Sequence, residues 1–301
     1  MKYALQICCV CICLIGNASM ANEFYQLGLN VGNEDNLPRG FDPSHQLDAS
    51  FFQANLSAGK FLQLGLNDSL SVSAKLEATR YDQLKGFDNH GIGISADFGH
   101  KLGFGAYAPR LGINLSASRQ YFQGEARDSD RYGLELSYSR RISAGLMLAG
   151  GVDFNWSRTG DLPEDPRVTA FGYDPDIRLP YELFDYDAKS LFVSGEYAFE
   201  NGFLLGLGYR RILGATVAST PVPTQKVYKF SDAFYSDPAF ESRDWFAYQL
   251  DANTDEWSLS GSWALGIDSS LNLGVTWNDS AVPANRSYTN TSITFGLLHN
   301  F

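Results

Sequence analysis

Apolar and polar residues alternate at a period of two over most of the chain, in short segments. In 131–139, one side of the alternation holds Tyr132, Leu134, Leu136 and Tyr138. In 151–157, Val152, Phe154 and Trp156 alternate with polar residues. Period two sends successive side chains to opposite faces of a β-strand. The pattern therefore predicts an all-β protein whose strands have one apolar and one polar face.

The segments between these strands fall into two classes that alternate along the chain. The first class is tight, with turns expected around 67–68, 103–105, 143–145, 200–202 and 268–269. The second class is long and polar, with loops expected at 33–46, 81–90, 124–130, 159–187, 214–253 and 278–287. Short turns at one end of a sheet and long loops at the other are typical of membrane β-barrels.

We predict twelve strands, and an even number puts both chain ends on the same side of a single-chain barrel. Boundary errors would still allow ten or fourteen. The segment at 47–66 is the least secure, because Lys60 falls on its apolar face, and a β-bulge would restore the alternation. The predicted strands lie near 23–31, 47–66, 70–80, 91–100, 109–122, 131–141, 146–157, 188–199, 203–213, 254–266, 270–277 and 288–301.

The two chain termini indicate export. Lys2 precedes an apolar run at 4–15 that is too short to span a bilayer, and Ser19 and Ala21 provide the small residues of a cleavage site. We expect residues 1–21 to be a signal peptide that is removed after Ala21. The predicted signal contains all four cysteines, at positions 8, 9, 11 and 13. The mature chain would thus lack disulfides and thiolate metal sites.

The last strand is amphipathic and ends on Phe301. In this respect the chain resembles bacterial outer-membrane β-barrels, whose assembly machinery reads a terminal phenylalanine. His299 departs from that pattern, because these proteins usually have tyrosine or an apolar residue there. The resemblance implies that 22–301 form one transmembrane antiparallel up-and-down barrel of about twelve strands, with long extracellular loops. The same alternation would suit a soluble β-sandwich or a lipocalin-like can, with the apolar face turned inward.

Composition excludes several functions. The formal net charge of −11 argues against nucleic-acid binding, which needs a basic face. No Walker loop, Rossmann glycine pattern or zinc motif is present, so we expect no cofactor and no metal. The loop at 159–187 is rich in acidic residues, but it lacks the spacing of a known calcium loop. We expect acidic extracellular loops that are solvated.

Charged residues on the polar face would line the lumen of the barrel. Such charges must pair with each other or contact water. They could form a salt-bridge network that closes the interior, or line a water-filled pore in which the acidic excess favours cations. The predicted lumen-lining residues are Lys75, Glu77, Asp97, Glu135, Asp153, Glu196, Arg210 and Glu256.

Four arginines have the opposite parity and lie at the loop ends of their strands: Arg80, Arg119, Arg158 and Arg211. Charge is tolerated at a membrane interface, and arginine binds phosphate through two parallel hydrogen bonds. We therefore expect these arginines to contact lipopolysaccharide in the outer leaflet. Alternatively, their side chains only extend to water.

These features favour a monomeric porin-like channel in the outer membrane for passive passage of small solutes. Its expected partners are outer-membrane lipid, lipopolysaccharide and the barrel assembly machinery, for which Phe301 is the signal. A non-conducting barrel that binds a partner or stabilises the envelope is the alternative. A lipid hydrolase is a third reading, because His45 and His90 lie in neighbouring outer loops. No hydrolase motif accompanies them, so we predict no enzymatic activity.

Overall fold

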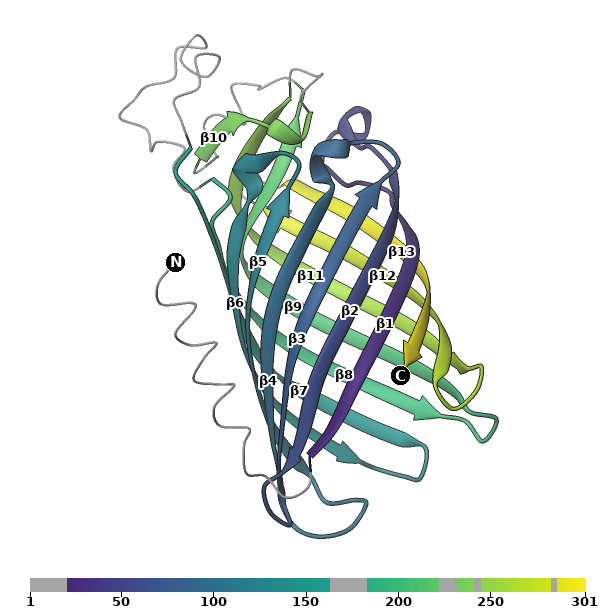
Figure 1. Cartoon of the computed structure of the whole chain (residues 1–301). Coiled ribbons are helices and arrows are strands. Elements are labelled where there is room, and N and C mark those ends of the chain that lie inside the picture. The colour runs from purple at the N-terminus through teal and green to yellow at the C-terminus, as the bar shows by residue number, and fades with distance from the viewer. Residues whose placement is uncertain (1–20, 163–182, 222–230, 232, 241–244, 283–285) are drawn as a thin grey trace.

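The structure is a computed structural model that describes residues 21–162, 183–221, 231, 233–240, 245–282 and 286–301. Twelve of its strands form a closed antiparallel barrel, and a short additional strand, β10, extends the sheet at the loop end (Figure 1). No helix among these residues is long and apolar enough to cross a bilayer. The predicted signal peptide lies outside the described residues, except for Ala21, which begins β1.

Each barrel strand pairs with the barrel strands before and after it in sequence, and β1 pairs with β13 to close the ring. β10 is not part of the ring, because β9 pairs directly with β11. The prediction of twelve barrel strands is therefore confirmed. The barrel strands are β1 (Ala21–Glu34), β2 (Ala49–Gln63), β3 (Asp68–Tyr81), β4 (Asn89–Lys101), β5 (Arg110–Phe122), β6 (Ser129–Arg141), β7 (Leu146–Thr159), β8 (Tyr186–Ala198), β9 (Phe203–Thr220), β11 (Phe246–Ala264), β12 (Ser269–Val282) and β13 (Arg286–Asn300).

The register of β2 shows that the expected bulge was wrong. Its pairing with β1 and with β3 runs without interruption along the strand. Lys60 lies opposite Glu23 on β1 and opposite Val72 on β3, so it occupies the outer face three residues from the end of β2. A lysine this close to a strand end can extend its ammonium group to the membrane surface, so no change of phase is needed.

The predicted loop at 214–253 is also wrong as a single polar loop. β9 continues to Thr220 and β11 begins at Phe246, and the two pair without a break over this extension. β10 (Ala233–Ser236) pairs with the beginning of β11. Residues such as Tyr248 and Leu250 keep the alternation of a strand, but they pack at the mouth of the barrel. The polar loop expected at 278–287 is also shorter than predicted, because β12 reaches Val282 and β13 begins at Arg286.

The two faces of the wall differ in the way that the sequence predicts for a membrane barrel. Large apolar side chains such as Leu76, Leu115, Leu191 and Phe295 are each more than half exposed along the outer face. In contrast, almost all fully buried apolar residues among those described lie at the loop end. They form three clusters, which include Phe234 and Tyr248, Phe87 and Trp245, and Leu183 and Ala247, respectively. The hydrophobic core of the described protein therefore lies at the mouth rather than inside the barrel.

Candidate functional site

A folded segment lies across the loop end of the barrel, and we call it the cap. It consists of the β9 extension (215–220), β10, the 3-10 helix η6 (Pro238–Phe240) and the β11 extension (246–252). Its three strands form a small antiparallel sheet. Phe234, Phe246 and Tyr248 pack on one side of this sheet, whereas Ala247 packs against Leu183 on the other. Because both faces are covered, the cap is folded like a small soluble protein.

Aromatic stacking and burial stabilise the cap. The rings of Phe240 and Trp245 stack with centroids 4.3 Å apart, and those of Phe234 and Phe246 stack at 5.0 Å. Such pairs contribute about 0.5–1.5 kcal/mol each beyond the burial of their area. Burial also raises the pKa of the Tyr248 phenol.

Two glycines let the cap dock on loops from the opposite part of the ring. Gly86 lies in the 3-10 helix η3 (Lys85–Phe87) between β3 and β4, and a Cβ added there would lie 2.2 Å from the Cα of Ala239. Gly124 precedes the 3-10 helix η4 (Glu125–Arg127), and its Cβ would lie 3.1 Å from the carbonyl carbon of Pro238. The backbone of η6 thus contacts both loops directly.

A buried ion pair connects the cap to the wall loops. The side chain of Asp237 is fully buried, and its carboxylate lies 2.7 Å from the Nη2 atom of Arg127. The Ala239 amide and the Ser219 hydroxyl also donate to this carboxylate. The Arg127 guanidinium lies over the rings of Phe87 and Phe184, at 4.7 and 4.6 Å from their centroids. Both charges are therefore satisfied, which is the condition for a stable pair in a buried site.

The loop after β1 holds the cap from another side. The Arg39 guanidinium donates to the Thr216 hydroxyl at 2.9 Å, and that hydroxyl lies 2.7 Å from the Tyr288 hydroxyl. The Ser219 amide donates to the Pro38 carbonyl at 2.9 Å. The β9 extension is therefore anchored to segments from both sides of the β13–β1 closure.

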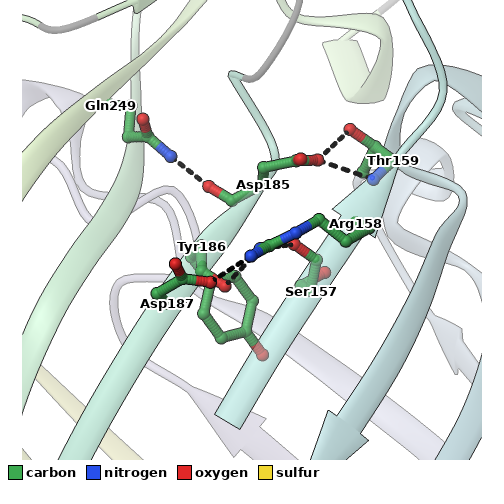
Figure 2. Close-up of polar contacts among 7 residues, drawn as sticks. All are labelled: Ser157, Arg158, Thr159, Asp185, Tyr186, Asp187 and Gln249. Carbon is green, nitrogen blue, oxygen red and sulfur yellow. Dashed lines mark hydrogen bonds and ion pairs between the residues drawn. The ribbon is translucent and has the colours of Figure 1, made fainter.

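The base of the loop between β7 and β8 adds a further anchor (Figure 2). The Asp185 carboxylate accepts hydrogen bonds from the amide and the hydroxyl of Thr159, at 2.6 and 2.7 Å. The Asp185 carbonyl in turn accepts from the Gln249 side chain on the β11 extension. The predicted acidic residues at 163–182 lie outside the described residues.

A cavity of about 520 Å³ lies beneath the cap. Its wall combines strand residues from the inner face with cap residues such as Thr216 and Ser219. Residues with amide, hydroxyl or charged side chains make up most of the lining, and they include four arginines and two glutamates. The charged lining residues are Arg39, Arg127, Arg131, Arg210, Glu34 and Glu256. The space is polar and large enough to hold water and a small solute.

The structure brings several predicted lumen residues together in pairs. Lys75 and Glu77 form an ion pair of 2.6 Å on β3, while the carboxylate of Asp97 accepts from Arg110 at 3.0 Å. Arg110 was not among the predicted residues. These are separate ion pairs, and whether the charged residues close the interior or line a pore stays a prediction.

Asp153 is the most buried charge of the predicted set. One carboxylate oxygen accepts from Asn155 and Ser190, at 2.7 and 3.0 Å. Arg210 approaches the other oxygen only to 3.7 Å, and that oxygen has no hydrogen bond. Cross-strand pairing places Glu135 beside Asp153, and Glu256 beside Arg210. Glu196 lies near the turn end of β8. Contact of these residues with a solute stays a prediction.

Three of the four outward arginines are paired with aspartates on adjacent strands. The ion pairs are Arg119–Asp130 at 3.0 Å, Arg158–Asp187 at 2.6 Å (Figure 2), and Arg211–Asp255. The aspartates were not predicted from the sequence, because the strand register that aligns them was unknown. Arg80 has no carboxylate within 4.0 Å among the described residues. Contact with lipopolysaccharide stays a prediction, which the pairing makes less favourable for three of the four.

Arg158→Ala should change the free energy of unfolding by less than about 1 kcal/mol, because exposed ion pairs contribute little. The side chains of Arg158 and Asp187 are 46% and 61% exposed. Thermal unfolding of the refolded barrel in detergent measures the effect. A large loss of stability would show that the pair is more than a surface contact.

The histidines do not form a hydrolase site in the described residues. The Ser44 hydroxyl donates to Asp42 at 2.7 Å, while His45 lies 3.3 Å from the Thr220 hydroxyl. His90 stacks on Tyr121. Among the described residues, neither His45 nor His90 is hydrogen-bonded to a serine, the contact that would activate a serine as a nucleophile. The Ser269 hydroxyl lies 2.8 Å from Nδ1 of His299, but this pair is at the turn end of the barrel, away from both outer loops. No group of three or more potential metal ligands is present in the described part of the chain.

Phe301 is 73% exposed at the end of the chain. Its amide donates to the Tyr25 carbonyl on β1, and its ring contacts His299 edge to face. The aromatic side chain is thus accessible at the closure of the barrel. Its role as an assembly signal stays a prediction.

No protein-family model and no curated protein matches the sequence. The fold, however, is similar to that of solved outer-membrane proteins. An outer membrane channel from Pseudomonas putida aligns with a TM-score of 0.59 and 10% identity, covering 95% of this chain and 98% of the other. The NanC porin aligns with a TM-score of 0.47 and 10% identity, covering 91% and 98% of the two chains. The architecture is that of an outer-membrane β-barrel, with twelve strands in the closed ring.

Proposed function

We propose that this outer-membrane β-barrel is a passive channel for small hydrophilic solutes, with an extracellular entrance that the cap narrows. The observation that carries the proposal is the polar cavity of about 520 Å³ inside the ring, directly beneath the cap. A barrel whose only task was structural could fill this space with side chains. A polar cavity instead holds water, which a diffusing solute can replace.

The neutral part of the lumen supports the same function. Ser258, Asn272, Thr276, Asn278 and Asn290 share the inner parity of β11, β12 and β13, and Asn278 and Asn290 line the cavity. Hydroxyl and amide groups can exchange hydrogen bonds with a passing solute without holding it through charge. This part of the wall suits uncharged or weakly charged hydrophilic molecules.

The distribution of charge supports weak selectivity. Acidic residues outnumber basic ones in the predicted lumen set, but arginines outnumber glutamates in the cavity. Some of these charges are already neutralised in ion pairs, as Glu77 is by Lys75 and Asp97 is by Arg110. We therefore propose a channel that favours neither sign strongly, rather than the cation preference that the acidic excess alone would indicate.

Conductance in planar lipid bilayers tests the proposal. The purified chain should produce discrete single-channel steps that are smaller than those of large open porins, since twelve strands enclose a narrower lumen and the cap narrows it further. Heat-denatured protein from the same preparation is the control for detergent leakage. Absence of conductance from correctly folded protein would favour the non-conducting alternative.

The extent of the folded cap favours that alternative, in which the cap acts as a closed surface for a partner. The two readings differ in a measurable way, because only a channel conducts while the cap is intact. In either case, we propose that the chain is an exported monomer of the outer membrane with no enzymatic activity.

A further inference from the structure

Arg80 differs from the other outward arginines in its surroundings. Arg119, Arg158 and Arg211 each contact an aspartate on an adjacent strand. Among the described residues, Arg80 has no such partner, although Asp82 lies two positions away. An arginine at a membrane interface with unused donors is suited to bind an external anion.

Arg80 ends a row of apolar side chains on the outer face. Strand pairing aligns Phe295 on β13 with Val31 on β1, then Val31 with Phe52 on β2, and Phe52 with Arg80 on β3. Val31, Phe52 and Phe295 are each about half exposed. These four residues line a groove of about 660 Å³ on the barrel wall.

The next row toward the loops is mostly polar. It contains Asn33, Ser50 and Asp82, which also line the groove, and it begins with Ile293 on β13. One oxygen of the Asp82 carboxylate accepts from the amides of Ser50 and Gln83, at 3.0 and 2.7 Å. These backbone bonds hold one oxygen of the Asp82 carboxylate at the end of the strand, and among the described residues Asp82 forms no ion pair with Arg80. The groove therefore crosses the boundary between the apolar zone and the extracellular interface.

We propose that the groove binds lipid A, the membrane anchor of lipopolysaccharide. An acyl chain would lie along Val31, Phe52 and Phe295, and a phosphate would contact the guanidinium of Arg80. The position at the loop end selects a lipid of the outer leaflet, and the cation beside an apolar groove matches an acylated phosphate. In this proposal Arg80 binds the phosphate, whereas Arg119, Arg158 and Arg211 do not, because each already has a carboxylate partner.

The test measures binding of lipid A to delipidated protein in detergent by native mass spectrometry. Arg80→Gln should weaken binding about tenfold or more, the usual effect of losing a charge-assisted hydrogen bond. Arg158→Gln is the matched control, and it should stay within about twofold of the wild type because Arg158 is already paired. Arg80→Lys should retain part of the affinity. Dephosphorylated lipid A should bind the wild type weakly, with about the affinity that Arg80→Gln has for phosphorylated lipid A.

A second variant tests the apolar part of the groove. Val31→Trp should fill it and weaken binding while Arg80 is intact. The heat-dependent shift in gel electrophoresis shows that each variant is folded. The proposal is overturned if Arg80→Gln binds like the wild type, if Arg158→Gln loses as much affinity, or if phosphatidylglycerol binds the wild type as tightly as lipid A.

Discussion

Arg127→Ala should raise the single-channel conductance of the barrel several-fold. The change leaves the fully buried carboxylate of Asp237 without its cation. Breaking a buried ion pair by removing one partner costs about 3–5 kcal/mol, which is large for a segment as small as the cap. The lost contacts of Arg127 with Phe87 and Phe184 would weaken the cap further. Planar-bilayer recordings measure the conductance, and limited proteolysis measures exposure of the cap.

Asp237→Asn provides an independent variant of nearly the same volume, and it should act in the same direction because Arg127 then lacks its anion. Arg158→Ala is the control, since it removes an exposed ion pair outside the cap and should leave conductance unchanged. The strand pairing of the ring does not involve Arg127, so both cap variants should remain folded barrels. Unchanged conductance together with unchanged proteolysis would show that this pair does not hold the cap.

The second large effect is expected from Gly86→Leu. A Cβ at this position would lie 2.2 Å from the Cα of Ala239, so η3 and η6 would have to separate. Added volume in a tight contact costs about 1–3 kcal/mol, and occasionally more. The cap should therefore become sensitive to protease and the channel more conductive, although Arg127 and Asp237 are both unchanged in this variant.

Gly266→Leu is the matched control for this substitution. Gly266 lies in the turn between β11 and β12, and a Cβ there has no neighbour within 4 Å. Neither glycine has a positive φ, so the comparison isolates the contact from backbone strain. If Gly86→Leu left the cap as resistant to protease as this control does, docking of η6 on η3 would not contribute to closure.

The barrel itself could be predicted from the sequence because each strand has one apolar and one polar face, and because nearly all strands pair with the next strand along the chain. Alternation in segments such as 131–139 identifies the strands, and the contrast between tight turns and long loops identifies the two ends. The bulge expected near Lys60 was wrong, because the outer face need not be apolar near the membrane surface. A lysine is tolerated there, and the strand pairs without interruption.

The cap could not be predicted, because it depends on contacts between residues far apart in sequence. Arg127 and Asp237 are 110 positions apart, and neither belongs to a motif. The alternation from 246 to 250 was a signal that the loop contains a strand, but its apolar side faces the mouth rather than lipid. Gly86 looked like an ordinary loop glycine, since its importance comes only from the approach of Ala239.

The apolar core at the mouth has a consequence for how the molecule is stabilised. The wall is held by its hydrogen-bonded ring and the surrounding acyl chains, whereas the cap excludes water from its own interior, as a domain in aqueous solution does. We therefore expect urea or heat to unfold the cap while the ring stays intact. Residues of the wall must suit the surrounding lipid, whereas residues of the cap must suit its own buried core. Substitutions in the cap can therefore accumulate without changing the surface that faces the bilayer.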